Sequence, residues 1–142
     1  MSLAYLEEAK KVATFNYDGS ENGFLLELFK DENKTLLYIT SAKPGAFKGY
    51  HLHRIRASRY VCIRGKMKII LFKPGTNEQE EFVLDASKPQ RLFIPKDLAT
   101  GLQNVGDEEA WLVNFPDPPY DPSLKDEQVE YTREELEQGI VK

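Results

Sequence analysis

Short runs of apolar residues, separated by polar turns, repeat along the whole chain. Within residues 66–72, the apolar side chains of Met67, Ile69 and Leu71 occupy every second position. Period-two patterning is typical of a strand with one buried face. Similar β-favouring runs lie at 10–17, 23–29, 35–41, 59–65, 81–85, 91–95 and 110–115, between segments rich in Gly, Pro, Asn and Asp. Many short strands without intervening helices predict an all-β sandwich, jelly roll or barrel.

One short helix is predicted near the C-terminus. Thr132 and Glu135 have the Thr-x-x-Glu spacing of a capping box. The preceding run 116–122, PDPPYDP, predicts a stiff extended segment because proline fixes φ. We interpret 123–138 as a solvated helix and its approach, with no function. The expected organisation is one domain over residues 1–142, with a core at about 20–122 and a tail at 123–142 that carries the helix.

Composition narrows the classes of partner. The chain has 142 residues, 41% of them hydrophobic, and a net charge of −4, which argues against a nucleic-acid or anionic-membrane surface. No apolar stretch approaches the roughly 20 residues of a membrane span, and the acidic N-terminus is unlike a signal peptide. Cys62 is the single cysteine, in an apolar run that predicts a buried structural thiol. We expect a cytoplasmic protein without nucleic-acid or membrane partners.

Both histidines of the chain lie in the stretch 45–65, GAFKGYHLHRIRASRYVCIRG. Residues i and i+2 of a strand face the same side, so His51 and His53 are predicted to project together, with Gly49 and Ile55 on that side. The basic residues around them, in an acidic chain, suggest one anionic small molecule. The pair itself is compatible with a metal site, with a catalytic base and its neighbour, or with a polar strand without function.

This stretch resembles the first cupin motif, G-x5-H-x-H-x3,4-E-x6-G. Gly45, His51, His53 and Gly65 match it, but Ser58 stands where the motif has Glu. The second motif, G-x5-P-x-G-x2-H-x3-N, falls on Pro89, Pro95, Asp97, Thr100 and Asn104. Pro95 and Asn104 match it, and Thr100 stands where it has His. Two imidazoles alone bind a transition metal weakly, so we expect no metal and no cofactor. A metal-dependent cupin with improvised ligands remains an alternative.

Among cupins, the chain is similar to the dTDP-4-dehydrorhamnose 3,5-epimerase group. The similarity rests on the segments KGYH (48–51), LFIPKDLATGL (92–102) and GFLLE (23–27), within about 20–122. It implies a jelly-roll barrel (the cupin double-stranded β-helix), usually a homodimer. It also implies an isomerase that acts on a 4-keto-6-deoxy sugar attached to a nucleotide diphosphate.

The resemblance also implies roles for single residues. It makes His51 the base that removes a proton next to the ketone, and Glu27 a contact to the nucleotide. Thr100 takes the place of the family's barrel histidine, and Val113 that of its proton-donor tyrosine, which leaves Tyr120 as the available phenol. A base near neutral pKa and a stabiliser of the enolate oxygen are what such a reaction needs.

The remaining candidates follow from that chemistry. His53 could relay the proton, and Lys48 or Arg59 could stabilise the enolate. Bidentate cations suit a diphosphate, and the candidates are Arg54, Arg56, Arg59 and Arg91. The predicted catalytic residues are thus His51, His53 and Tyr120. The predicted substrate-binding residues are Glu27, Lys48, Arg54, Arg59, Arg91 and Thr100.

Other members of the superfamily keep the alternatives open. The His-x-His pair also resembles the sugar 3,4-ketoisomerases and the cupin domain of bifunctional capsular-sugar reductases. A different class of function is a non-catalytic cupin that binds a nucleotide sugar or a related ligand, because the positions of the acid tyrosine and the barrel histidine have changed.

Overall fold

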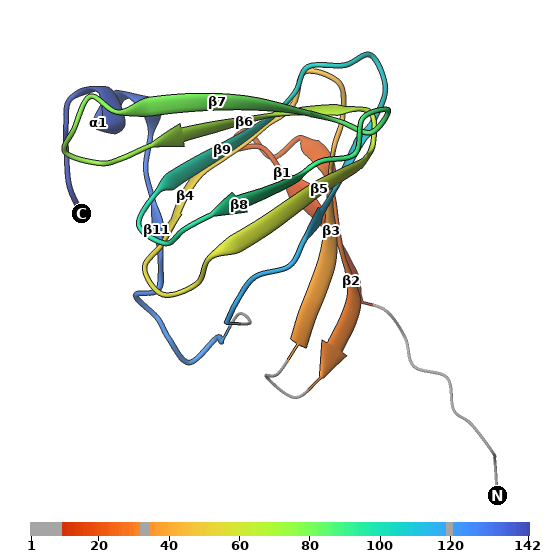
Figure 1. Cartoon of the computed structure of the whole chain (residues 1–142), viewed down its shortest axis with the longest axis horizontal. Coiled ribbons are helices and arrows are strands. Elements are labelled where there is room, and N and C mark those ends of the chain that lie inside the picture. Colours follow the sequence, from red (N-terminus) through yellow and green to blue (C-terminus); the bar gives the residue numbers. More distant parts are fainter. Residues whose placement is uncertain (1–9, 32–34, 119–120) are drawn as a thin grey trace, which may run out of the picture.

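The computed structural model describes residues 10–31, 35–118 and 121–142, which form two antiparallel β-sheets and one short helix (Figure 1). The first sheet has the order β1-β2-β3-β10-β5-β8. Its strands are β1 (Lys11–Phe15), β2 (Glu21–Asp31), β3 (Thr35–Ala42), β10 (Ala110–Asn114), β5 (Ser58–Arg64) and β8 (Arg91–Ile94). The second sheet has the order β11-β4-β9-β6-β7. Its strands are β11 (Gln128–Glu130), β4 (Phe47–His53), β9 (Ala99–Asn104), β6 (Lys66–Phe72) and β7 (Gln79–Asp85).

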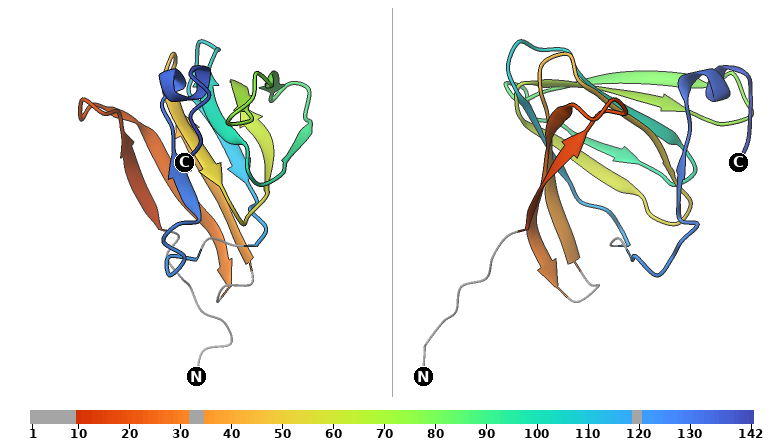
Figure 2. Two further views of the ribbon diagram at one scale, coloured as in Figure 1. Left: turned by 90° about the vertical axis from the view of Figure 1, so that its left-hand side faces the viewer. Right: turned by 180° about the vertical axis from the view of Figure 1, so that it is seen from behind.

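The main core lies between the two sheets, which confirms the all-β barrel predicted from the alternation. Met67, Ile69 and Leu71 of β6 face inward and pack with Leu112 and Cys62 of the first sheet. Met67 and Ile69 are fully buried, and Cys62 is a buried free thiol, as expected. The barrel opens between the β1–β3 part of the first sheet and the β4–β11 edge of the second (Figure 2).

A second apolar cluster covers the outer face of the second sheet. Tyr50 and Leu52 of β4 and Phe72 of β6 pack there against Tyr131 and Leu136 from the C-terminal segment. The helix α1 (Arg133–Glu137) begins at the predicted capping box. The interpretation of 123–138 as a solvated approach was therefore wrong, because this segment adds a strand to the sheet and buries apolar side chains.

Strand β4 directs both histidines toward the space between the sheets. Tyr50 and Leu52 face outward, so His51 and His53 face inward. A register shift against β9 lies between Lys48 and His51, at Gly49, where φ is +137°. A Cβ on Gly49 would lie 2.8 Å from the Thr100 carbonyl oxygen, so only glycine fits this close approach.

The shift changes which residues share a face with the histidines. Lys48 pairs with the core residue Leu102, so Lys48 faces inward instead of Gly49. The predicted alternation was wrong at Gly49 because one extra residue enters β4 there. It also does not reach Ile55, which lies beyond the end of the strand and is exposed.

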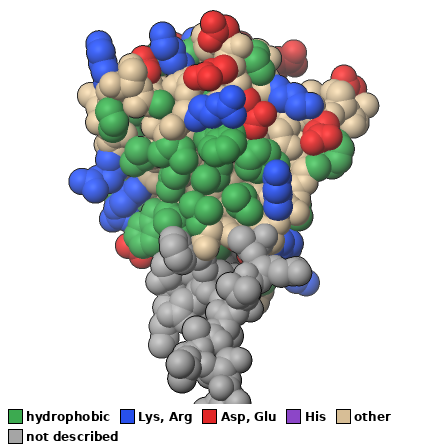
Figure 3. Space-filling model, turned by 90° about the vertical axis from the view of Figure 1, so that its right-hand side faces the viewer, with side chains coloured by type: hydrophobic (Ala, Val, Ile, Leu, Met, Phe, Trp, Pro, Cys, Tyr) green, Lys and Arg blue, Asp and Glu red, His purple; other side chains and the backbone are tan. Residues whose placement is uncertain are grey.

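The outer face of the first sheet carries an apolar row. Leu26, Ile39, Val113 and Val61 are cross-strand neighbours on β2, β3, β10 and β5. Figure 3 shows hydrophobic side chains gathered on the side of the molecule that this sheet covers. Among the described residues, no helix is long and apolar enough to cross a membrane.

Candidate functional site

A cavity of about 470 Å³ opens beside β4. Lys48 and His51 line it from β4, and Glu130 and Arg133 line it from the C-terminal segment. The turn that follows β1 closes the opposite side. A volume of this size suits a small-molecule ligand.

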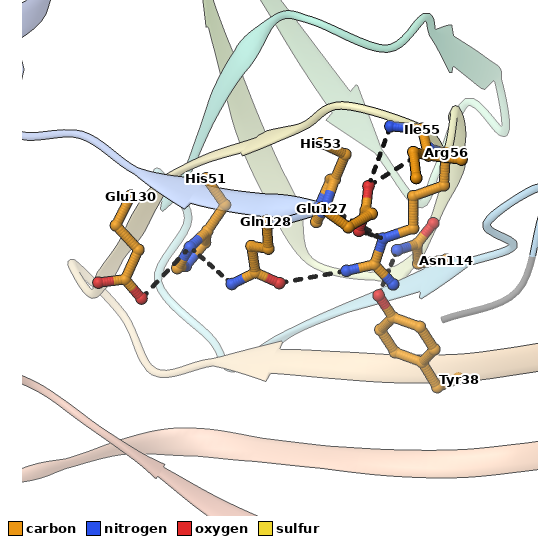
Figure 4. A network of polar contacts seen from close by, with 9 residues as sticks. All are labelled: Tyr38, His51, His53, Ile55, Arg56, Asn114, Glu127, Gln128 and Glu130. Atoms are coloured by element: carbon orange, nitrogen blue, oxygen red, sulfur yellow. Dashed lines mark hydrogen bonds and ion pairs between the residues drawn. The ribbon is translucent and has the colours of Figure 1, made fainter. Parts of the chain in front are cut away.

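His51 is connected to the buried arginine Arg56 through the side chain of Gln128 (Figure 4). The Nε2 atom of Gln128 lies 3.2 Å from Nδ1 of His51. The Oε1 atom of Gln128 accepts a hydrogen bond of 3.2 Å from Nη2 of Arg56. Glu130 also lies near the ring, with its Oε1 3.8 Å from Nδ1 of His51.

Arg56 and Glu127 form a buried ion pair next to His53. Both side chains are only 7% exposed, and Nε of Arg56 lies 3.0 Å from Oε1 of Glu127. Arg56 Nε also donates to Nδ1 of His53 at 3.0 Å, and Glu127 Oε1 lies 3.3 Å from the same nitrogen. The backbone N–H groups of Ile55 and Arg56 donate to the other carboxylate oxygen, each at 3.3 Å.

These contacts set the protonation of both histidines and of Glu127. Burial, with the Arg56 charge, holds the pKa of His51 and of His53 below its usual value near 6.5. Burial raises the pKa of Glu127, but His53, Arg56 and the two backbone donors outweigh it, so the pKa is lowered. At neutral pH both rings are therefore neutral and Glu127 is a carboxylate.

Lys48 has the lowest pKa of the cations that line the first cavity. Burial lowers the pKa of Lys48 to about 8, and the nearby Glu109 offsets only part of this effect. Its Nζ donates a hydrogen bond of 3.1 Å to the Thr40 hydroxyl on β3. Lys48 therefore carries both its charged and its neutral form near physiological pH.

A second cavity, of about 330 Å³, lies beside Gln128. It is lined by Glu27, Tyr38, Arg56 and Gln128, together with Lys10 and apolar side chains. The Tyr38 hydroxyl accepts a hydrogen bond of 2.5 Å from Asn114, and burial raises the pKa of this phenol. Gln128, which lines this second cavity, also contacts His51, which lines the first.

The structure brings some predicted site residues together. His51, His53 and Lys48 face the interior, and Thr100 pairs with His51 on β9 and faces it as well. Glu27 lines the second cavity.

The other predicted residues lie apart from the histidines. Arg59 faces the outer side of the first sheet, where it pairs with Asp117 at 3.7 Å and covers the Phe93 ring. Arg91 is exposed on β8, and Arg54 donates to the Lys142 carbonyl at 2.9 Å. Val113 also faces outward, and Tyr120 lies outside the described residues.

The C-terminal segment supplies the side chains that the sequence did not reveal. Glu127, Gln128 and Glu130 are the polar partners of the histidines, and Arg133 adds a cation to the first cavity. A charged tail of this composition predicts a solvent-exposed surface, so nothing in its local pattern indicates that these four residues belong to the site. The only signal was Val129 and Tyr131, apolar positions two residues apart.

The interior offers only a partial set of metal ligands. Within residues 10–31, 35–118 and 121–142, no three His, Cys, Asp or Glu side chains group to hold a metal ion. Ser58 and Thr100 occupy the remaining cupin ligand positions with hydroxyl groups, and both are buried. Nδ1 of each histidine is already engaged by protein groups.

Comparison with known proteins agrees with this architecture. The probable low-salt glycan biosynthesis epimerase Agl13 of Haloferax volcanii is 25% identical over 130 residues, which are 83% of each chain. The spore coat polysaccharide biosynthesis protein SpsL of Bacillus subtilis is 24% identical over 127 residues, 82% of this chain and 84% of SpsL.

Solved structures give the same fold. The capsular polysaccharide assembling protein CapF of Staphylococcus aureus superposes with a TM-score of 0.73 at 19% identity, over 84% of this chain but only 34% of CapF. NovW, a 4-keto-6-deoxy sugar epimerase of Streptomyces spheroides, superposes with a TM-score of 0.60 at 15% identity, over 88% of this chain and 67% of NovW. These likenesses confirm the predicted cupin barrel.

The family is shown by the sequence itself. Residues 18–128 match the family model described as the polysaccharide biosynthesis C-terminal domain. This match covers most of the 142 residues. The chain belongs to the polysaccharide biosynthesis C-terminal domain family.

Proposed function

We propose that this protein is a nucleotide-sugar epimerase that acts on a dTDP-linked 4-keto-6-deoxy sugar. The reaction removes a proton from the carbon next to the ketone and returns a proton to it, and His51 mediates the transfer. The observation that carries the proposal is the cavity wall of β4, where His51 and Lys48 line the same small-molecule-sized cavity. Relatives with the names of sugar epimerases support the same reaction class.

The two residues match the two needs of an enolate reaction. A proton next to a ketone leaves only when a base accepts it and a hydrogen-bond donor or a cation stabilises the enolate oxygen. His51 is neutral at physiological pH, and Lys48 titrates near it, so each can fill either need. The resemblance to the epimerases gives the base role to His51.

Cations at the cavity support a diphosphate as part of the ligand. Arg133 and Lys48 line the first cavity, and Arg56 lines the second. Arginine and lysine are the side chains that bind phosphate oxygens most strongly. Arg54, Arg59 and Arg91 line neither cavity, so we assign this task to Arg133.

A non-catalytic nucleotide-sugar-binding cupin is the second candidate. It is favoured by the outward orientation of Val113, the position that the epimerases use for their acid tyrosine, and by the hydroxyl of Thr100 opposite His51. Such a protein would bind the same ligand in the same cavity and leave its protons in place.

Solvent exchange separates the two candidates. The protein is incubated with dTDP-4-keto-6-deoxyglucose in D2O, and the ring protons are followed by NMR. The epimerase predicts deuterium at carbon 3, or at carbons 3 and 5, faster than in buffer and lost in His51→Ala. The exposed Arg91→Ala variant, on the outer face, is the control and retains exchange. Binding without exchange above buffer would contradict the enzyme and favour the binding protein.

A homodimer is proposed as the assembly. On the outer face of the first sheet, the half-buried Leu26, Val61 and Val113 and the exposed Phe93 form a surface that a second copy would bury, since exposed apolar patches mark interaction sites. The epimerase resemblance, which implies a dimer, supports the same assembly.

A further inference from the structure

The amide of Gln128 has one orientation that satisfies both of its neighbours. The guanidinium of Arg56 has hydrogen-bond donors and no acceptor, so the Gln128 oxygen must face it. The amide nitrogen, with its two N–H groups, then faces Nδ1 of His51 at 3.2 Å. Arg56 is itself held by the buried Glu127 carboxylate at 3.0 Å. Gln128 is thereby fixed as a donor toward His51.

This donor decides where the proton of His51 resides. A neutral imidazole has one N–H and one lone pair, and the nitrogen that accepts a hydrogen bond is the one without the proton. Because Nδ1 accepts from Gln128, the proton is on Nε2. The Glu130 carboxylate is 3.8 Å from Nδ1, beyond hydrogen-bond distance, so it does not draw a proton to Nδ1.

The surroundings of His51 also favour the neutral ring. The charged or titratable groups that act on it are Glu130 from β11, Arg56 from the turn after β4, and His53 on its own strand, whereas β9 contributes the uncharged Thr100. Burial and the Arg56 charge lower the pKa of His51, against the opposing effect of Glu130. An imidazolium would point an Nδ1–H at the amide N–H of Gln128.

We propose that Gln128 is a positioning residue that makes His51 a hydrogen-bond donor to the ketone oxygen of the substrate, and that the amine of Lys48 is the base. This rests on the proposed epimerase function and reverses the base role that the family resemblance assigns to His51. The structure supports this proposal because a base at Nε2 would need a lone pair on that nitrogen. The hydrogen bond from Gln128 to Nδ1 places the proton of the neutral ring on Nε2, so no lone pair is available there. Lys48 and Tyr50 are the other titratable groups of β4 that line the same cavity, and burial raises the pKa of the Tyr50 phenol, which leaves the Lys48 amine as the base.

The proton-removal step balances with these two residues. The neutral amine of Lys48 takes the proton from the carbon next to the ketone and becomes an ammonium. The electron pair of the broken C–H bond forms the enolate double bond, and the carbonyl pair moves onto oxygen. The resulting negative charge accepts the hydrogen bond from Nε2–H of His51, which remains neutral throughout. A neutral imidazole in this role costs no desolvated positive charge.

The first test reads the tautomer without substrate. The full chain is labelled with ¹⁵N, and long-range ¹H–¹⁵N correlation spectra are recorded at neutral pH; with only two histidines, His53→Gln assigns the signals. We expect Nε2 of His51 to have the shift of a protonated nitrogen and Nδ1 that of an unprotonated one. The opposite pattern would overturn the inference.

A single substitution then inverts the hydrogen bond. Gln128 is exposed on its strand, so Gln128→Glu places an acceptor beside Nδ1 without disturbing the core. We expect the proton of His51 to move to Nδ1 and its pKa to rise. The control Gln79→Glu adds the same charge at an exposed site of β7 and leaves both signals unchanged.

The deuterium exchange rate of Gln128→Glu distinguishes the two roles of His51, because it should fall if His51 is the hydrogen-bond donor and rise if His51 is the base. If His51 donates to the oxygen, Gln128→Glu lowers the deuterium exchange rate by about 100-fold, the effect of removing one oxyanion donor. If His51 is the base, the new carboxylate makes it a better base and the rate rises, which would overturn the inference. Failure of the proposed function looks different: wild-type protein would show no exchange at all, whatever its tautomer.

Discussion

Removing one partner of the buried Arg56–Glu127 pair should cost more stability than removing a partner of any other ion pair described here, and Arg56→Met tests this. The variant removes the guanidinium and leaves the Glu127 carboxylate, 7% exposed, without its charged partner. An uncompensated buried charge costs about 3–5 kcal/mol. Since a domain of this size is stable by roughly 5–15 kcal/mol, the loss is a large share of the total. With a urea slope of roughly 1–3 kcal/mol per M, the unfolding midpoint falls by about 2 M.

The assay is equilibrium unfolding in urea followed by tryptophan fluorescence, since the chain has one tryptophan. Arg59→Met is the matched control, because Arg59 is 35% exposed and stands 3.7 Å from Asp117. An exposed pair of this kind contributes about 0–1 kcal/mol. Adding Glu127→Gln to Arg56→Met removes the orphaned charge but keeps an acceptor for the backbone donors, so it should recover part of the loss. Equal effects of Arg56→Met and Arg59→Met would refute the reasoning.

Three further predictions follow from protonation and surface pattern. In the folded chain the pKa values of His51 and His53 lie below the unfolded value near 6.5, so the unfolded chain binds more protons as the pH falls. The melting temperature should therefore decrease as the pH is lowered below 6.5, and it should decrease less steeply in His53→Gln. A melting temperature that does not change between pH 7 and pH 5 would contradict this. With Lys48 as base, kcat/KM should rise with pH toward a plateau above about 8, and a fall over that range would identify the ammonium as the active form. Phe93 is 54% exposed on the outer face of the first sheet, and Phe93→Asp should convert a dimer to a monomer, as measured by light scattering. Val83→Asp, at a side chain 52% exposed on the second sheet, is the control and should leave the dimer intact. Dimers in both variants would place the interface elsewhere.

Period-two patterning predicted the strands that carry the main core. It succeeded for Met67, Ile69 and Leu71 because one face of β6 packs on the opposite sheet. It gave no reason for the burial of Ile70 and Phe72 on the other face, which the C-terminal segment covers from about 60 residues further along the chain. Local pattern records whether a side chain is apolar, and not what will later pack on it.

The site was predictable only in part for the same reason. The spacing of His51 and His53 placed both on one face, but the register shift at Gly49, which brings Lys48 to that face, depends on close contact with β9. The partners of the histidines come from Glu127 and Gln128, more than 70 residues away. No local signal relates residues at that separation. The sequence therefore offered no reason to select Arg56, the arginine that contacts Glu127 and Gln128, over the arginines near it.

The central claim is that His51 mediates proton exchange next to a sugar ketone, and the exchange rate in D2O measures this most directly. Wild-type protein and His51→Gln are compared at equal concentration with dTDP-4-keto-6-deoxyglucose, and deuterium at carbons 3 and 5 is followed by NMR. The account predicts exchange well above buffer in the wild type and a fall of at least about 100-fold in the variant, within the range for loss of a group that transfers a proton or stabilises the enolate. Equal exchange rates in the two proteins would contradict it.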